Sequence, residues 1–176
     1  MKIKFAINFS LWIGLTSGIY VFLYMHTPLA SAGVLACTFV ALPIYLNGGA
    51  KGAEMLDYCS SAIVGVLWGL VFIYATEFLN NTGAEVTFSA SFIVFIATAV
   101  LCAIHFLCGP MKYLTRVPIM FGAIASTFFV GPDKWLYLMV TLCLGVVLGY
   151  VNSYGARLLD PDGRWILFRA KQKQVS

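Results

Sequence analysis

Six long apolar runs, separated by short polar segments, make up most of the chain. They cover residues 5–24, 29–46, 58–78, 86–107, 116–130 and 135–158. A bilayer core about 30 Å thick needs roughly 20 helical residues for each crossing. The pattern therefore predicts an all-α membrane protein in which residues 1–158 form one domain, a compact bundle of six transmembrane helices. Residues 159–176 remain as a basic cytoplasmic tail.

The composition agrees with this pattern. Of the 176 residues, 61% are hydrophobic and 10% are charged, whereas soluble domains carry about 25% charged residues. The five cysteines lie in or at the ends of apolar runs, so we expect free thiols that pack as small apolar groups. The net charge of +4 is expected to set membrane orientation, and no nucleic-acid partner is expected.

Basic residues fall almost entirely on one side of the predicted bundle. Ten lie on the side of the N-terminus, and only Lys134 lies on the other. Because cytoplasmic segments carry an excess of Lys and Arg, both termini are predicted to be cytoplasmic. The first run is longer than the apolar core of a signal peptide, about 7–15 residues, so we expect it to be retained. The predicted location is a bacterial inner membrane, with the lipid bilayer as partner.

Near-repeats suggest how the helices are related. At a separation of 61 residues, Gly48 matches Gly109 and Lys51 matches Lys112. We interpret the unit as a hairpin of two helices, used three times in parallel orientation, and expect the joints 48–51 and 109–112 to be structurally equivalent. Chance matches between apolar segments are the alternative.

Pairs of glycines spaced by four residues mark close-packing helix faces. The three pairs are Gly14 and Gly18, Gly65 and Gly69, and Gly145 and Gly149. Helices in lipid associate through such small residues because their backbones can approach closely. We predict packing within one bundle, with a homo-oligomer interface as the alternative.

The distribution of glycine, proline and aromatic residues resembles the YcdZ-like family of small bacterial inner-membrane proteins of unknown function. The residues that carry the resemblance are Ala36-Cys37-Thr38, Pro43, Gly48-Gly49-Ala50-Lys51-Gly52, Gly65, Trp68, Ile73-Tyr74, Val117-Pro118, Phe121-Gly122, Trp135, Leu144-Gly145 and Gly149-Tyr150. The resemblance implies the same membrane fold and no particular activity, substrate or cofactor.

The cluster that most resembles an enzyme or metal site is Cys102, His105 and Cys108. On a helix, Cys102 and Cys108 would lie about 9 Å apart along the axis and about 120° apart around it. Two thiolates that bind one zinc ion at about 2.3 Å cannot be so distant. We therefore predict no metal site, no cofactor and no catalytic residues, and expect His105 to be hydrogen-bonded inside the bundle.

Two functional hypotheses remain. One is a channel or transporter for a small neutral or weakly charged solute. The path would be lined by polar side chains and a helix break, at Pro43, Asn47, Ser60, Ser61, His105, Ser126, Thr127 and Asn152. The other is a non-transporting membrane scaffold or accessory subunit. In either case, the basic, aromatic tail after residue 159 suits contact with anionic lipid, or simple exposure to water.

Overall fold

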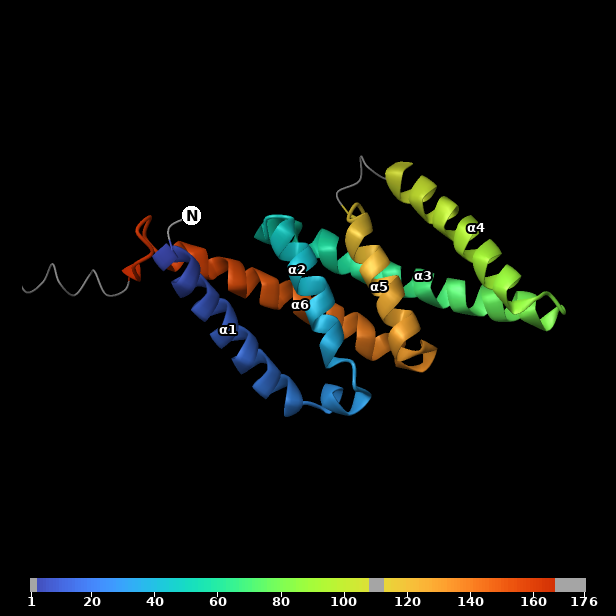
Figure 1. Cartoon of the computed structure of the whole chain (residues 1–176), viewed down its shortest axis with the longest axis horizontal. Coiled ribbons are helices and arrows are strands. Elements are labelled where there is room, and N and C mark those ends of the chain that lie inside the picture. The colour runs from blue at the N-terminus through green and yellow to red at the C-terminus, as the bar shows by residue number, and fades with distance from the viewer. Residues whose placement is uncertain (1–2, 108–112, 167–176) are drawn as a thin grey trace, which may run out of the picture.

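A computed structural model describes residues 3–107 and 113–166 of the chain (Figure 1). Within this part, the α-helices are α1 Ile3–Met25, α2 Thr38–Asn47, α3 Met55–Asn81, α4 Val86–Leu107, α5 Val117–Val130 and α6 Trp135–Tyr154. Short 3₁₀ turns cover Pro28–Ala32, Leu35–Cys37, Gly52–Glu54, Pro132–Lys134 and Gly155–Leu158. The protein is an all-α bundle, as predicted.

Among residues 3–107 and 113–166, four helical stretches are long and apolar enough to cross a membrane. They are Ile3–Met25, Gly52–Asn81, Val86–Leu107 and Pro132–Leu158. The stretches Leu35–Asn47 and Val117–Val130 are apolar but shorter. This set confirms a multi-pass, membrane-like protein.

The prediction of one continuous helix over residues 29–46 is wrong. This region holds two 3₁₀ turns before α2 begins at Thr38. Between the turns, Gly33 adopts a φ of 70°, a left-handed conformation that glycine tolerates and a continuing helix does not. The turn at Pro28–Ala32 also has a proline at its start. As a result, α2 has only 10 residues.

The helices form two halves of three rather than three hairpins of two. The most extensive packing joins α3 to α5 and α2 to α6, while α3 and α6 also contact each other. On the outside, α1 packs on α6 and α4 packs on α3. A half-turn about an axis that runs along the view between α2 and α5 places α1–α3 on α4–α6 (Figure 1). Because three helices reverse the chain direction, the second half is inverted relative to the first.

The sequence of the long central helices carries the same relation at a separation of 80 residues. In α3 and α6, the matching pairs are Gly65/Gly145, Val66/Val146, Gly69/Gly149, Val71/Val151 and Tyr74/Tyr154. The 3₁₀ turns that precede these two helices match at the same separation. After α2 and α5, Gly49 and Gly131 adopt similar positive φ angles of 92° and 87°. The joint at 109–112 lies outside the described residues.

The matched glycines allow close contacts between the backbones of the two halves. A Cβ at Gly65 would lie 2.6 Å from the carbonyl oxygen of Met120 in α5, and a Cβ at Gly145 would lie 2.5 Å from that of Thr38 in α2. Gly69 and Gly149 lie one turn further along the same contacts. In contrast, Gly14 and Gly18 have no heavy atom of another segment within 4 Å of a Cβ position. Their face of α1 is open in this chain.

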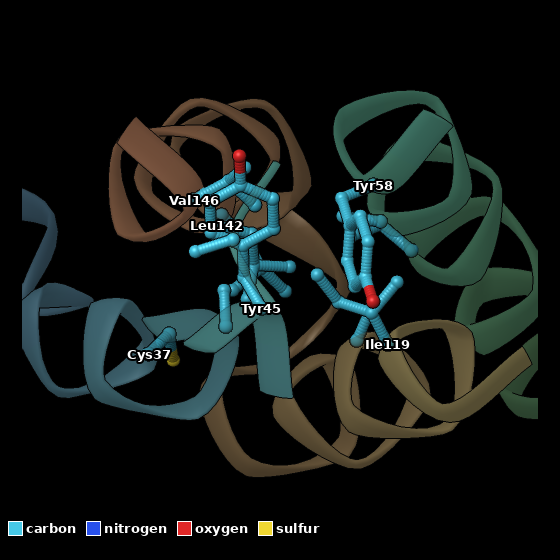
Figure 2. Close-up of a cluster of buried hydrophobic side chains, with 12 residues drawn as sticks. Cys37, Tyr45, Tyr58, Ile119, Leu142 and Val146 are labelled. Atoms are coloured by element: carbon cyan, nitrogen blue, oxygen red, sulfur yellow. The ribbon is translucent and has the colours of Figure 1, made fainter. Parts of the chain in front are cut away.

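The main core lies where α2, α3, α5 and α6 meet (Figure 2). Several of its residues are equivalent between the halves, including Ala41 with Ala123 and Val66 with Val146. The rings of Tyr45 and Tyr58 pack edge to face with centroids 4.9 Å apart. Tyr45 Oη donates a hydrogen bond of 3.0 Å to the carbonyl of Lys51, which satisfies its polar end within the core.

The first part of the predicted tail is folded against α1. Leu159 and Trp165 form an isolated antiparallel bridge. The side-chain amide of Asn8 donates a 2.7 Å hydrogen bond to the carbonyl of Gly163, and the rings of Trp12 and Trp165 lie 6.3 Å apart. Residues 167–176 lie outside the described part of the chain.

We expect the start of α4 to depend on pH through Glu85. Its carboxylate accepts hydrogen bonds from the backbone N–H groups of Thr87 and Phe88, at 2.8 and 2.7 Å, and these bonds lower its pKa. A lowered pKa means that the cap is intact above the unfolded-state pKa, about 4.3, and is lost as the pH falls through the folded-state pKa. Hydrogen exchange at Thr87 and Phe88, corrected for intrinsic rates, should therefore accelerate in acid. A Glu85→Gln variant should not show this acid-dependent step, and an unchanged profile in the wild type would contradict the prediction.

Candidate functional site

The seam between α2 and α5 holds a cavity near the C-terminal end of α2. Its volume is about 300 Å³ and its lining residues are Ile44, Asn47, Gly48, Tyr58, Thr115, Arg116 and Pro118. We call it the Asn47 cavity. The end of α2 contributes an amide, and the segment that leads into α5 contributes a hydroxyl and a guanidinium. The cavity therefore offers several hydrogen-bonding groups beside apolar walls.

A buried carboxylate organises the polar wall of this cavity. Asp57, in the first turn of α3, has only 5% of its surface exposed. It accepts hydrogen bonds from the backbone N–H and hydroxyl of Thr115, at 2.9 and 2.6 Å, and from Nε of Arg116 at 2.8 Å. Ser61 accepts a further bond of 3.2 Å from the backbone N–H of Arg116. The start of α5 is thus tied to α3.

The charges around Arg116 are balanced within the same cluster. Its Nη2 lies 2.8 Å from Glu54 Oε2, and Lys51 Nζ lies 3.1 Å from Glu54 Oε1. The guanidinium carbon is also 4.9 Å from the centre of the Tyr58 ring, within the range of a cation–π interaction. Two carboxylates and two cations leave the wall polar but with no formal net charge. We call these residues, with Asp57, the Arg116 cluster.

A second cavity lies near the opposite end of the same seam. Its volume is about 280 Å³ and it is lined by Ala36, Cys37, Val40, Gly122, Ala125, Ser126 and Phe129. We call it the Ser126 cavity. The hydroxyl of Ser126 donates a 2.8 Å hydrogen bond to the carbonyl of Gly122. Because Cys37 and Ser126 are its only lining residues with polar side chains, this cavity is much less polar than the Asn47 cavity.

Helices α2 and α5 pack closely between the two cavities. A Cβ at Gly122 of α5 would lie 2.9 Å from Val40 Cγ1 and 3.1 Å from Ile44 Cδ1 of α2. A side chain larger than hydrogen at this position would therefore force the Val40 and Ile44 side chains to shift, and a large one would fill the space between the two helices. Val40 and Gly122 line one cavity and Ile44 lines the other, so this contact is the constriction between them.

The predicted path residues do not gather in one place. Asn47 lines one cavity and Ser126 lines the other. Ser61 belongs to the wall beside Asp57, and Ser60 bonds to the carbonyl of Asp57. Pro43 lies on the exposed side of α2.

The remaining three predicted residues lie at other helix contacts. Thr127 is buried against Gly69 and bonds to the carbonyl of Ala123. Asn152 is fully buried beside α1, where its Oδ1 lies 2.5 Å from the hydroxyl of Thr16. No path that runs through all eight residues is visible in the described chain.

His105 is bonded inside the bundle, as expected. Trp68 Nε1 donates to His105 Nε2 at 3.2 Å, and His105 Nδ1 lies 3.1 Å from the carbonyl of Leu114. These partners assign the proton to Nδ1 in a neutral ring. Cys108, the third member of the predicted cluster, lies outside the described residues.

Sequence reasoning missed the residues that hold the site together. In the sequence, Asp57 lies just before the run 58–78 and Arg116 begins the run 116–130, so each marks the start of a different predicted helix. The signal was present in their opposite charge and shared predicted side of the membrane. No local pattern, however, pairs two residues that lie 59 positions apart.

Comparison with known proteins finds a matching family model. A family model described as a protein of unknown function, DUF1097, matches residues 10–157. No curated protein and no solved structure matches the chain. The matched range includes α2–α6 and all residues of the two cavities. The chain therefore belongs to the DUF1097 family, a family whose function is unknown.

Proposed function

We propose that the protein passes a small neutral or weakly charged solute across the membrane along the seam between α2 and α5. The observation that carries the proposal is the position of these two short helices. They occupy corresponding places in two inverted halves, as interrupted helices do at the binding sites of many transporters. A cavity lies at each end of the seam they form.

The chemistry of the cavities favours an uncharged solute. The amide of Asn47 and the hydroxyls of Thr115 and Tyr58 can replace part of a solute's hydration. The charges of the Arg116 cluster compensate one another, so the wall would neither repel nor strongly hold a neutral molecule. Cavities of this size suit a molecule such as urea or glycerol.

We place the protein in a bacterial inner membrane with both termini cytoplasmic, because ten of its eleven Lys and Arg residues lie on that side of the predicted topology. The Asn47 cavity would then face the cytoplasm. We further propose contact of the tail with anionic lipid, and no enzymatic activity. The closer relation to the YcdZ-like proteins stays a prediction and adds no substrate.

Solute permeation into reconstituted vesicles tests the proposal. Vesicles with the protein should reswell faster in urea or glycerol than empty vesicles. Gly122→Leu, which fills the constriction, should return the rate to that of empty vesicles. Gly14→Leu is the matched control because nothing surrounds that position, and it should keep the wild-type rate.

Asn47→Leu gives a second arm that leaves the constriction unchanged. It removes the amide from an exposed position of α2, where the fold should tolerate it, and should slow permeation of hydrogen-bonding solutes. Identical swelling with and without folded protein, across a panel of small solutes, would favour a scaffold or accessory subunit. The open glycine face of α1 would then be the first surface to test for a partner.

A further inference from the structure

Three lining positions of the Asn47 cavity correspond to lining positions of the Ser126 cavity under the half-turn that relates the halves of the molecule. The helix contacts of α2 and α5 correspond at a separation of 82 residues, since Ala41 and Ala123 meet matched glycines of α6 and α3. At this separation, Asn47 and Ile44 of the Asn47 cavity match Phe129 and Ser126 of the Ser126 cavity. Pro118 of the first likewise matches Ala36 of the second.

We propose that these cavities are two access sites for one solute, which open alternately as the two halves rock against each other. This inference rests on the proposed function and makes the protein a carrier rather than a channel. A fold built from two inverted halves can exchange the conformations of its halves, and this exchange turns an opening on one side into an opening on the other. The tight contact at Gly122 is the barrier that the motion would move.

The Arg116 cluster is placed to control one of the two openings. Glu54 and Asp57 belong to the first half, whereas Thr115 and Arg116 belong to the second. Their ion pairs and hydrogen bonds therefore join the halves at the end that holds the Asn47 cavity. Opening this end by separation of α3 and α5 must break them.

The opposite end lacks the residues for such a cluster. The positions that correspond to Glu54 and Asp57 hold Lys134 and Tyr137, and the position that corresponds to Arg116 holds Val34. The two ends therefore differ in how strongly charge holds them closed. Weakening the cluster should shift the balance toward opening at the Asn47 cavity and closure at the Ser126 cavity.

Thiol labelling at both cavities tests this coupling. One protein keeps Cys37 as its only cysteine and reports on the Ser126 cavity. A second, otherwise free of cysteine, carries Ile44→Cys at a half-buried lining position and reports on the Asn47 cavity. Adding Asp57→Asn should raise the labelling rate at position 44 and lower it at Cys37, by about tenfold for a coupling of about 1.4 kcal/mol. Glu77→Gln, an exposed acid near the far end of α3, is the matched control and should change neither rate.

A reversible bridge tests the same motion without loss of the buried carboxylate. Asn47→Cys and Pro118→Cys place two thiols on the wall of the Asn47 cavity, where a bifunctional methanethiosulfonate can join them. The bridge should reduce solute passage to the level of empty vesicles, and a reducing agent should restore it. In the unbridged protein, unlabelled solute inside the vesicles should accelerate uptake of labelled solute from outside. The reason is that a carrier changes its open side faster with solute bound than when empty.

The outcomes separate the carrier from the channel and from the scaffold. Rates that rise together at both cavities, or a bridged protein that passes solute at the unbridged rate, would overturn alternate opening and leave passage itself intact. Opposite changes in the two rates, with no passage of any solute, would support the rocking motion and overturn the proposed function. Opposite changes together with accelerated exchange are the expected result.

Discussion

Replacing Gly65 with alanine should destabilise the protein, whereas the same change at Gly14 should not. At Gly65, the added Cβ would lie 2.7 Å from the Cα of Met120 and 2.8 Å from the Cβ of Ala123. Since two backbones must separate to relieve this contact, the expected loss is about 1–3 kcal/mol of the free energy of unfolding, typical of overpacked sites. Gly145→Ala should behave similarly, because it meets Thr38 and Ala41 of α2.

The Gly14→Ala variant is the matched control for this prediction. It has the same motif, GxxxG, but no heavy atom of another segment within 4 Å. Alanine should even stabilise this helix position, by up to about 1 kcal/mol of helix propensity. Reversible unfolding in mixed micelles measures the three variants. Equal effects at Gly14 and Gly65 would show that the contact of α3 with α5 is not the one described.

Replacing Arg116 with alanine should cost about 3 kcal/mol of stability, because it leaves the carboxylate of Asp57 buried without its cation. Breaking one partner of a buried ion pair typically costs 3–5 kcal/mol, and the lower end applies since 32% of the Arg116 side chain is exposed. Thr115 would continue to donate two hydrogen bonds to Asp57. The remaining penalty is the uncompensated charge.

The double variant with Asp57→Asn separates this charge effect from lost packing. If charge dominates, Asp57→Asn should recover much of the loss caused by Arg116→Ala, and the two changes should be far from additive. Arg157→Ala is the matched control, since this arginine is exposed and lies over the ring of Tyr154. Its removal should cost no more than about 1 kcal/mol. Additive losses at Asp57 and Arg116 would contradict the prediction.

The ends of the helices could be predicted where they depend only on neighbouring residues in the sequence. The run 86–107 coincides with α4, and the last run begins at Trp135 as predicted. In these segments, the length of apolar sequence and the flanking polar residues are sufficient. The run 29–46 was mispredicted because apolar composition alone does not distinguish a helix from 3₁₀ turns around a glycine with positive φ.

The packing of the helices against one another could not be predicted from patterns in the sequence. The hairpin interpretation rested on matches at a separation of 61 residues, whereas the fold follows matches at 80. Both sets consist of residues that are common in apolar segments. The structure distinguishes them, because Gly65 and Gly145 sit at equivalent contacts between the halves, whereas Gly14 with the same spacing does not. A glycine motif states that a close approach is allowed, and not which helix makes it.

The sequence by itself determined that this is a multi-pass, all-α membrane protein. The free energy of transferring a segment into a bilayer depends mainly on its own side chains and length, so long apolar runs indicate membrane helices without knowledge of the fold. Only the tertiary structure decided the two inverted halves, the seam with its two cavities and the union of Asp57 with Arg116. In lipid, no hydrophobic force favours one helix pairing over another. The pairing follows from the close backbone contacts at Gly65 and Gly145, and from the ion pair between the buried carboxylate of Asp57 and Arg116 on another helix.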